Sequence, residues 1–203
     1  LGIFITILFS NYFYGSFKIN SFNKNTKSSN QTINFKIVTA GLKLSEFNDP
    51  KNVASKLIKM SEPEKEKNTI FVWPEGAFMS EYFFKVKKNE KIKKLFRDNF
   101  SKNHLIILGA STLKKNTLKE KYFNSMIVVD NNLNIVSKYD KKKLVPFGEF
   151  LPLENLLSGL GLKKITPGYS SFSKGETKSL LEFDFKEINL KLLPLVCYEI
   201  IFH

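Results

Sequence analysis

Thr69-Ile70-Phe71-Val72-Trp73-Pro74-Glu75 is the stretch of this chain that decides its fold. Residues 69–73 form a continuously apolar run, which is typical of a β-strand that is covered on both faces. The run is bounded by the charged connector 62–67 on one side and by Glu75 on the other. The stretch therefore predicts a strand inside a layered fold, with a carboxylate near its end.

Strands and helices alternate on either side of this run. The predicted strands cover residues 35–40, 69–73, 105–110, 122–129, 135–139, 180–185 and 187–196, and the predicted helices begin at Asp49-Pro50 and cover 81–100. Asp130-Asn131-Asn132 is a good turn sequence between two of the strands. Alternating strands and helices followed by strands in series predict an α/β layered fold with a sizeable sheet.

Composition limits the classes of function. The chain has 203 residues with 42% hydrophobic residues, enough for one domain with a core, and a net charge of +13. Such a charge suits nucleic acid or an anionic membrane, but the excess is nearly all lysine and no nucleic-acid-binding signature accompanies it, so no nucleic-acid partner is predicted. One cysteine and two histidines argue against a disulfide framework and a metal site. No metal or cofactor is expected.

The first residues are more apolar than the rest of the chain. Residues 1–9 are almost all apolar, and the aromatic cluster 12–14 before polar sequence resembles a membrane-interface belt. A full membrane helix needs about 20 apolar residues, so we interpret residues 1–15 as the end of a transmembrane helix. A buried first element of a soluble fold is the alternative. Residues 16–33 have the composition of a polar linker, and 34–203 form the predicted domain.

Cys197 is the only cysteine of the chain. It follows the apolar run 190–196, which we predict to be a strand that leads into a turn, a recurrent way to present a nucleophile. The chain stops six residues later, which leaves no room for a covering helix, so we expect the domain to be truncated. The alternative is an inert core cysteine.

A thiol attacks as a thiolate, so it needs a base or a nearby cation. Glu75 could take its proton, although a glutamate after a strand can also simply begin a helix. Lys141 could stabilise an oxyanion and the thiolate, but it stands beside Lys142 and Lys143, and lysine runs are normally solvated. Spacing alone does not select among the three lysines.

Two further carboxylates lie close to these residues in sequence. Glu149 follows the rigid turn Pro146-Phe147-Gly148, so it could act in catalysis or hold the lysine in place. Glu199 lies two residues after Cys197 and could do similar work or face water. Tyr198 separates the two.

Glu75, Lys141 and Cys197, in this order, resemble the nitrilase (carbon-nitrogen hydrolase) superfamily. The fuller strings resemble the apolipoprotein N-acyltransferase family within it. These strings are Trp73-Pro74-Glu75-Gly76-Ala77, Tyr139-Asp140-Lys141, Leu144-Val145-Pro146-Phe147-Gly148-Glu149-Phe150-Leu151-Pro152, Ser171-Phe172-Ser173-Lys174-Gly175 and Cys197-Tyr198-Glu199-Ile200. The resemblance implies an αββα sandwich, here incomplete at its C-terminus.

The resemblance also implies roles for the residues. It makes Glu75 the general base, Lys141 rather than its lysine neighbours the cation, and Cys197 the acylated nucleophile, with Glu149, Glu199 and Tyr198 in support. The implied reaction moves a fatty acyl chain from a phospholipid to the amine of an S-diacylglyceryl-cysteine on an apolipoprotein, through a thioester. The implied location is the bacterial inner membrane, with the domain on its periplasmic side.

Two other functions fit parts of the sequence. A soluble nitrilase-type amidase would use the same Glu-Lys-Cys triad on a small amide. A non-enzymatic basic binding module would keep Cys197 only as core. For an enzyme, residues 153–162 are a candidate lid over the site.

Overall fold

The structure is a computed structural model that describes residues 2–25, 32–39, 41–42, 46, 49–115, 120–152, 171–176 and 180–202. The candidate lid at 153–162 lies outside these ranges. The chain divides into two compact units, Leu1–Thr32 and Ile33–His203, each described by itself below.

The first unit is one helix, α1 (Gly2–Asn25). It continues past residue 15, through ten residues whose composition predicts a linker; Ser, Asn and Lys weaken a helix by only a few tenths of a kcal/mol each (about 0.7 at most,). Its apolar side chains are exposed, among them Ile3, Tyr12 and Phe17. The membrane helix predicted here is not confirmed: none of the helices in the described ranges combines the length and the apolar character that a membrane crossing requires.

The second unit is built on a mixed sheet in the order β1-β2-β4-β5-β6, with β3 beside β4. Its strands are β1 (Asn34–Ile37), β2 (Thr69–Val72), β3 (Phe78–Tyr82), β4 (His104–Lys115), β5 (Glu120–Val129) and β6 (Ile135–Asp140). β1, β2 and β4 are parallel, whereas β5 and β6 continue the sheet as antiparallel neighbours. The apolar run at 69–73 is thus a central strand, as predicted.

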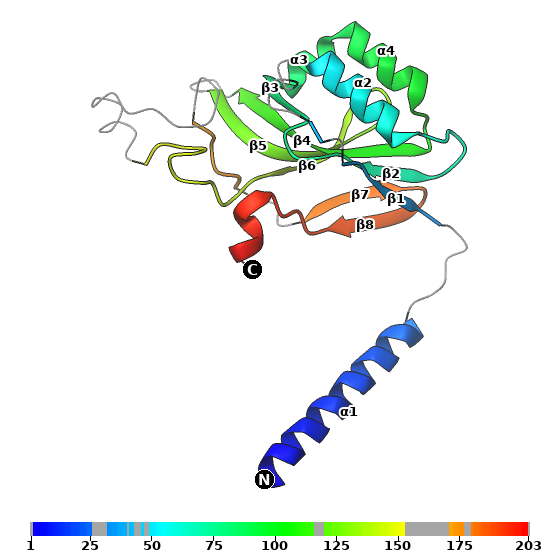
Figure 1. The fold of residues 1–203 in the computed structure, drawn as a ribbon, viewed down its shortest axis with the longest axis vertical. Coiled ribbons are helices and arrows are strands. Elements are labelled where there is room, and N and C mark those ends of the chain that lie inside the picture. The colour runs from blue at the N-terminus through cyan, green and yellow to red at the C-terminus, as the bar shows by residue number, and fades with distance from the viewer. Residues whose placement is uncertain are drawn as a thin grey trace. The chain divides into compact units, whose positions relative to one another are not determined.

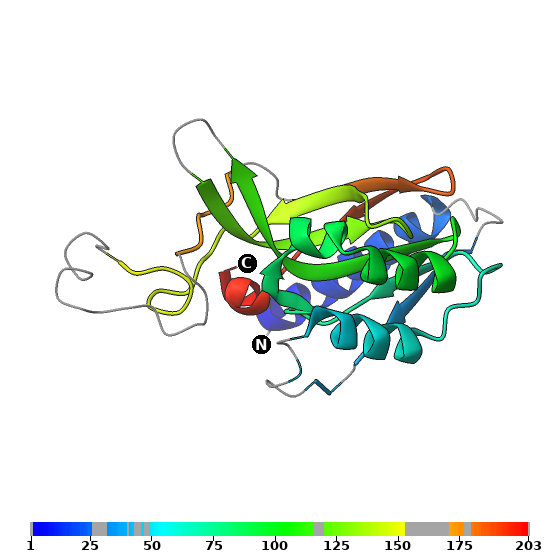
Figure 2. The ribbon, with the colours of Figure 1, turned by 90° about the horizontal axis from the view of Figure 1, so that it is seen from above.

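Three helices cover one face of this sheet: α2 (Pro50–Ser61), α3 (Phe83–Lys88) and α4 (Glu90–Asn99) (Figures 1 and 2). Asp49 caps α2 by accepting hydrogen bonds from the first turn, as its sequence predicts. The single helix predicted over 81–100 is wrong. β3 occupies its start, and Asn89 adopts an extended ψ of 104° and caps α4 with its side chain, which separates α3 from α4.

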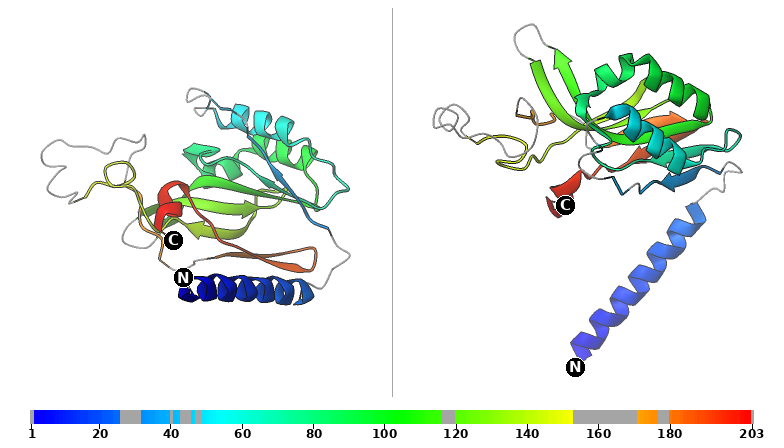
Figure 3. Two further views of the ribbon diagram at one scale, coloured as in Figure 1. Left: turned by 60° about the horizontal axis from the view of Figure 1, so that its bottom comes forward. Right: turned by 45° about the horizontal axis from the view of Figure 1, so that its top comes forward.

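A β-hairpin lies against the other face of the sheet (Figure 3, left). Its strands are β7 (Leu181–Phe185) and β8 (Ile188–Leu192). Leu181, Phe183 and Phe185 are buried in one cluster with apolar residues of β2, β4 and β5. The strand predicted to run to residue 196 ends at Leu192, two residues before Pro194, which has no N–H for a ladder. Cys197 therefore opens a short 3-10 helix, η2 (Cys197–Phe202), and does not directly follow a strand.

The described part of the second unit thus has a helix layer, a mixed sheet and a second sheet, in that order (Figure 1). These are three successive layers of the predicted αββα sandwich. Glu75 follows β2 and Lys141 follows β6, so both functional candidates lie just beyond strand ends of the same sheet.

Candidate active site

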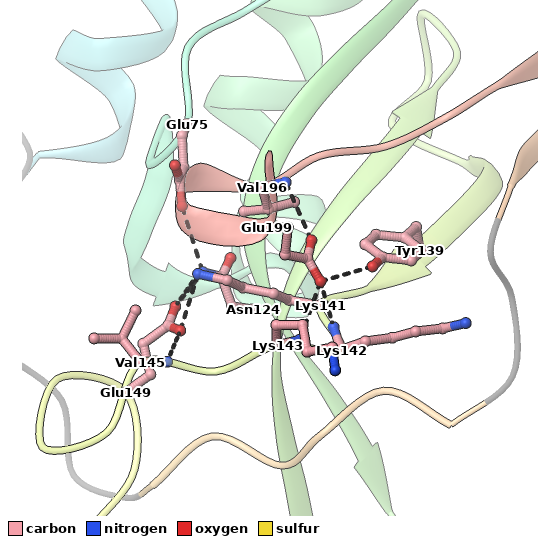
Figure 4. Close-up of polar contacts among 10 residues, drawn as sticks. All are labelled: Glu75, Asn124, Tyr139, Lys141, Lys142, Lys143, Val145, Glu149, Val196 and Glu199. Atoms are coloured by element: carbon pink, nitrogen blue, oxygen red, sulfur yellow. Dashed lines mark hydrogen bonds and ion pairs between the residues drawn. The ribbon is translucent and has the colours of Figure 1, made fainter. Parts of the chain in front are cut away.

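Lys141 is the most deeply buried charged side chain of the site, with 1% of its surface exposed. It follows β6 directly, and its N–H continues the strand pairing by donating to the Asn124 carbonyl at 2.9 Å. Its Nζ contacts both oxygens of Glu149, Oε1 at 3.0 Å and Oε2 at 2.9 Å (Figure 4). Lys142 and Lys143 are more exposed, so burial singles out Lys141 from the lysine run.

Glu149 is saturated with hydrogen-bond donors. Besides Lys141, its Oε1 accepts from Asn124 Nδ2 at 2.7 Å and its Oε2 accepts from the Val145 N–H at 2.9 Å. A carboxylate has about four acceptor positions, and Glu149 fills all of them. The geometry of Glu149 is that of a buried counter-ion for Lys141.

Glu75 has the opposite environment. It lies in the turn between β2 and β3, which passes so close to β4 that a Cβ on Gly109 would stand 3.1 Å from the Glu75 Cα. Gly76 supports this turn with a φ of 83°. The Glu75 side chain is exposed, and its polar contact among the described residues is a long hydrogen bond of 3.5 Å from Asn124 Nδ2 to Oε1. Its remaining lone pairs are available to accept a proton.

Asn124 is the residue of this site that the sequence reasoning missed. It lies in β5, is 2% exposed, and bonds to Lys141, Glu149 and Glu75. A signal was present: Asn124 is a polar amide within the run 122–129, which otherwise reads as a buried strand.

Glu199 joins the segment after Lys141 to the residue before Cys197. Its Oε1 accepts from the Tyr139 hydroxyl at 2.8 Å and from the N–H groups of Lys142 and Lys143 at 2.8 and 3.1 Å. Its Oε2 accepts from the Val196 N–H at 3.1 Å.

These contacts also determine the charge states of Glu199 and Tyr139. Burial would raise the pKa of Glu199, but the hydrogen bonds that it accepts outweigh burial and hold its pKa below the ordinary value. Burial, and then the bond to Glu199, raise the pKa of Tyr139. Glu199 is thus an anion, and Tyr139 is a neutral donor to it.

Cys197 is a free, exposed thiol whose backbone has a φ of 54°, a strained value for a residue with a side chain. Its sulfur makes no hydrogen bond to any residue that the structure describes. The contacts therefore bring together Glu75, Lys141 and Glu149, and they link Cys197 to this group only through its neighbour Val196. Tyr198 is 57% exposed and points to no particular role.

The cluster has the parts needed for acid-base and electrostatic work: a buried cation, its buried counter-ion and an exposed carboxylate. Among the residues with a described placement, no three or more His, Cys, Asp and Glu side chains are grouped as a metal ion would require.

Comparison with known proteins gives the chain a family. Residues 39–203 match the family model for carbon-nitrogen hydrolases. A carbon-nitrogen hydrolase from Helicobacter pylori G27 has a solved structure with 14% sequence identity and a TM-score of 0.44, covering 76% of this chain and 48% of that one. The family assignment does not depend on that structure.

Two similar sequences are named apolipoprotein N-acyltransferase. The protein from Rhizobium rhizogenes (strain K84 / ATCC BAA-868) is 34% identical over 135 residues, which is 66% of this chain and 24% of the relative. The protein from Rhizobium etli (strain CIAT 652) is 35% identical over 138 residues, with 67% and 24% covered. The chain spans about a quarter of the length of these relatives. Because the family model matches most of the chain, the protein belongs to the carbon-nitrogen hydrolase family.

Proposed function

We propose that the protein is an N-acyltransferase that moves a fatty acyl chain from a phospholipid to the N-terminal amine of an S-diacylglyceryl-cysteine on an apolipoprotein. The observation that carries this proposal is the contact group of Lys141, Glu149 and Glu75, since it pairs a buried cation with a carboxylate that can accept a proton. The two Rhizobium relatives supply the reaction class.

In the first half-reaction, Glu75 takes the proton of the Cys197 thiol, and the sulfur attacks the ester carbonyl of the phospholipid. The Lys141 ammonium stabilises the oxyanion of the tetrahedral intermediate. When the intermediate collapses, the C–O bond breaks and the lysophospholipid leaves with the proton that Glu75 returns. The fatty acyl chain remains on Cys197 as a thioester.

In the second half-reaction, the amine of the diacylglyceryl-cysteine attacks the thioester. Glu75 takes a proton from the attacking nitrogen, a second tetrahedral oxyanion forms beside Lys141, and the C–S bond breaks. The sulfur leaves as a thiolate and takes back the proton from Glu75. The product is an amide, and the free thiol is ready for the next donor.

In this reaction, Glu149 and Glu199 hold the machinery in place and do not take up protons. Glu149 fixes the Lys141 ammonium, and Glu199 fixes the backbone on both sides of the site. Both substrates are lipids, so the proposal places the protein at the bacterial inner membrane with the domain on the periplasmic side. The exposed apolar side chains of α1 support attachment to lipid. Nucleic acid has no part in it.

The test is the chemical state of lipoprotein N-termini in cells whose sole copy of this gene carries Cys197→Ser or Glu75→Gln, read by mass spectrometry. We expect lipoproteins that keep a free amine, because each variant removes one half of the thiol-base pair. Glu64→Gln, an exposed glutamate outside the site, serves as the matched control and leaves lipoproteins acylated. Fully N-acylated lipoproteins in the Cys197→Ser cells would rule the proposal out, and release of ammonia from small amides without acyl transfer would favour the amidase.

A further inference from the structure

Asn124 contacts all three members of the group formed by Lys141, Glu149 and Glu75. Its backbone carbonyl accepts from the Lys141 N–H at 2.9 Å, and its Nδ2 donates to Glu149 Oε1 at 2.7 Å and to Glu75 Oε1 at 3.5 Å (Figure 4). One residue of β5 therefore bonds to two stretches of the chain that lie far apart in sequence, the turn at Glu75 and the stretch 141–149.

We propose that Asn124 is a positioning residue of the reaction proposed above, whose side-chain amide holds the base Glu75 beside the Lys141–Glu149 ion pair. The inference rests on the proposed function, because it takes Glu75 to be the base.

The chemistry of an amide suits this place. Asn carries two N–H donors on one nitrogen and no charge, so it can face two carboxylates at once and leave the field of Lys141 intact. An Asp in its place would add a third carboxylate around one lysine. A hydroxyl side chain offers a single donor, and an apolar one offers none.

Glu75 needs such a contact because little else holds it. Its side chain is exposed, and a free glutamate side chain loses rotamer freedom when it is fixed. The amide contact restricts Oε1 and leaves Oε2 available for the proton. Without it, Glu75 would spend more of its time in rotamers that point away from Lys141.

A purely structural role for Asn124 would consist of satisfying the buried Glu149. The two roles differ in what a substitution changes. Loss of a structural contact lowers stability and activity together, whereas loss of positioning lowers turnover in a folded protein and alters its pH dependence.

The experiment compares Asn124→Ala and Asn124→Asp with wild type in the complete natural protein. Asn189 provides matched controls, since its Nδ2 also donates to a carboxylate, Asp184 Oδ1 at 2.8 Å, but on the exposed β7–β8 hairpin. Asn189→Ala removes an equivalent bond, and Asn189→Asp creates an equivalent carboxylate pair. The measurements are kcat and KM against pH, the thermal unfolding midpoint, and the rate of alkylation of Cys197 by iodoacetamide against pH.

We expect Asn124→Ala to lower kcat about 10–100-fold with little change in KM, in a protein that still unfolds well above the assay temperature. In Asn124→Asp, the added negative charge favours the protonated form of its neighbours. The acid limb of its rate profile and the onset of Cys197 alkylation therefore move to higher pH. Both Asn189 variants keep the wild-type profiles.

An unchanged kcat in Asn124→Ala, or a loss of activity that parallels a loss of folded protein, overturns the inference. Cys197 is the only cysteine of these 203 residues, so alkylation read by mass spectrometry on the peptide that contains it reports on the site without any lipid substrate. A shifted profile in Asn124→Asp, in a protein that transfers no acyl chain, would reject the acyltransferase and keep the positioning role. Acyl transfer by wild type with unshifted profiles in Asn124→Asp would reject the positioning role alone.

Discussion

The ammonium of Lys141 lies where water does not reach it, and that position has an energetic consequence. A buried charge is tolerated when it is paired and its partner is hydrogen-bonded in turn. Glu149 meets both conditions through Asn124 and the Val145 N–H. Removal of the negative charge of Glu149 would therefore leave the Lys141 ammonium buried and uncompensated.

Glu149→Gln tests this directly. The substitution keeps the shape of the side chain but removes the negative charge, so the Lys141 ammonium stays buried without a counter-ion. We expect the free energy of unfolding to fall by about 3–5 kcal/mol, measured by urea denaturation at pH 7. The control is Glu182→Gln, which breaks an exposed pair with Lys191 at 3.7 Å and should change stability by less than about 1 kcal/mol. A Glu149 variant as stable as that control would contradict the role of counter-ion.

At the scale of the element, the segment 171–176 supports the site from beside the sheet. The Phe172 N–H donates to the Glu149 carbonyl at 2.9 Å, and the Gly175 N–H donates to the Lys141 carbonyl at 2.9 Å. Gly175 lies so close to β6 that a Cβ there would overlap the Asp140 carbonyl. The close approach requires a glycine and explains why this segment can bond to both members of the ion pair.

Gly175→Ala should consequently displace the backbone at Lys141. We expect a loss of about 1–3 kcal/mol in the free energy of unfolding together with a lower rate of acyl transfer, read by urea denaturation and by the transfer assay. Gly15→Ala is the matched control: Gly15 lies inside α1 with nothing near its missing Cβ, so alanine there should stabilise the helix by up to about 1 kcal/mol. A harmless Gly175→Ala would show that the segment does not fix Lys141.

The elements also show what sequence can predict about this fold. The periodicity and turn signals of β2, α2, β5 and β6 come from residues close in sequence, and the structure has those elements where they were predicted. The split between α3 and α4 depends on one side chain, because Asn89 accepts hydrogen bonds from the first turn of α4 and so caps that helix. β3 lies in the stretch after Glu75, and its pairing with β4 is a long-range contact that a local pattern does not contain.

For the site, too, some residues were predicted from the sequence and others required the tertiary structure. The resemblance selected Lys141 from three adjacent lysines, and Lys141 is the one of the three that is buried. Asn124 was not predicted because its contacts depend on partners that follow β2, follow β6 and lie in the turn after residue 145, which only the fold brings together. The position of Cys197 also differs from the prediction. The strand predicted to lead directly into Cys197 ends earlier, at Leu192.

At the scale of the whole second unit, His104 lies at the end of the sheet opposite the site residues. It begins β4, is 1% exposed, and packs against the Phe71 ring at 5.2 Å. Its Nδ1 accepts from the Ser101 N–H at 3.1 Å, so Nδ1 is unprotonated, and its Nε2–H donates to the Glu64 carbonyl at 3.0 Å. Burial is the main cause that lowers the pKa of His104, and the nearby Lys186 and Lys65 lower it further.

This environment predicts a pH-dependent stability. Because the pKa of His104 in the folded state lies below its ordinary value of 6.5, the unfolded chain takes up a proton first as the pH falls. The contribution of His104 is therefore complete above about pH 6.5 and is lost as the pH drops from there through the folded pKa. Urea denaturation between pH 5 and 7.5 should show this loss in wild type and a flatter dependence in His104→Gln. His203→Gln, which removes the other histidine, should keep the wild-type dependence, and an equal flattening there would contradict the assignment.

The bonds of Glu199 also set an order of events during biosynthesis. Glu199 follows Lys142 by 57 residues, and a ribosome adding about 5–20 residues per second needs roughly 3–11 s to cover that interval. Throughout this time Glu75 and Lys141 already exist in the nascent chain, whereas Glu199, whose carboxylate bonds to the backbone beside Cys197, has not yet been made. Cys197 and Glu199 are thus the last of these groups to be supplied, and the contacts of Glu199 form only after the sheet beneath them has been synthesised.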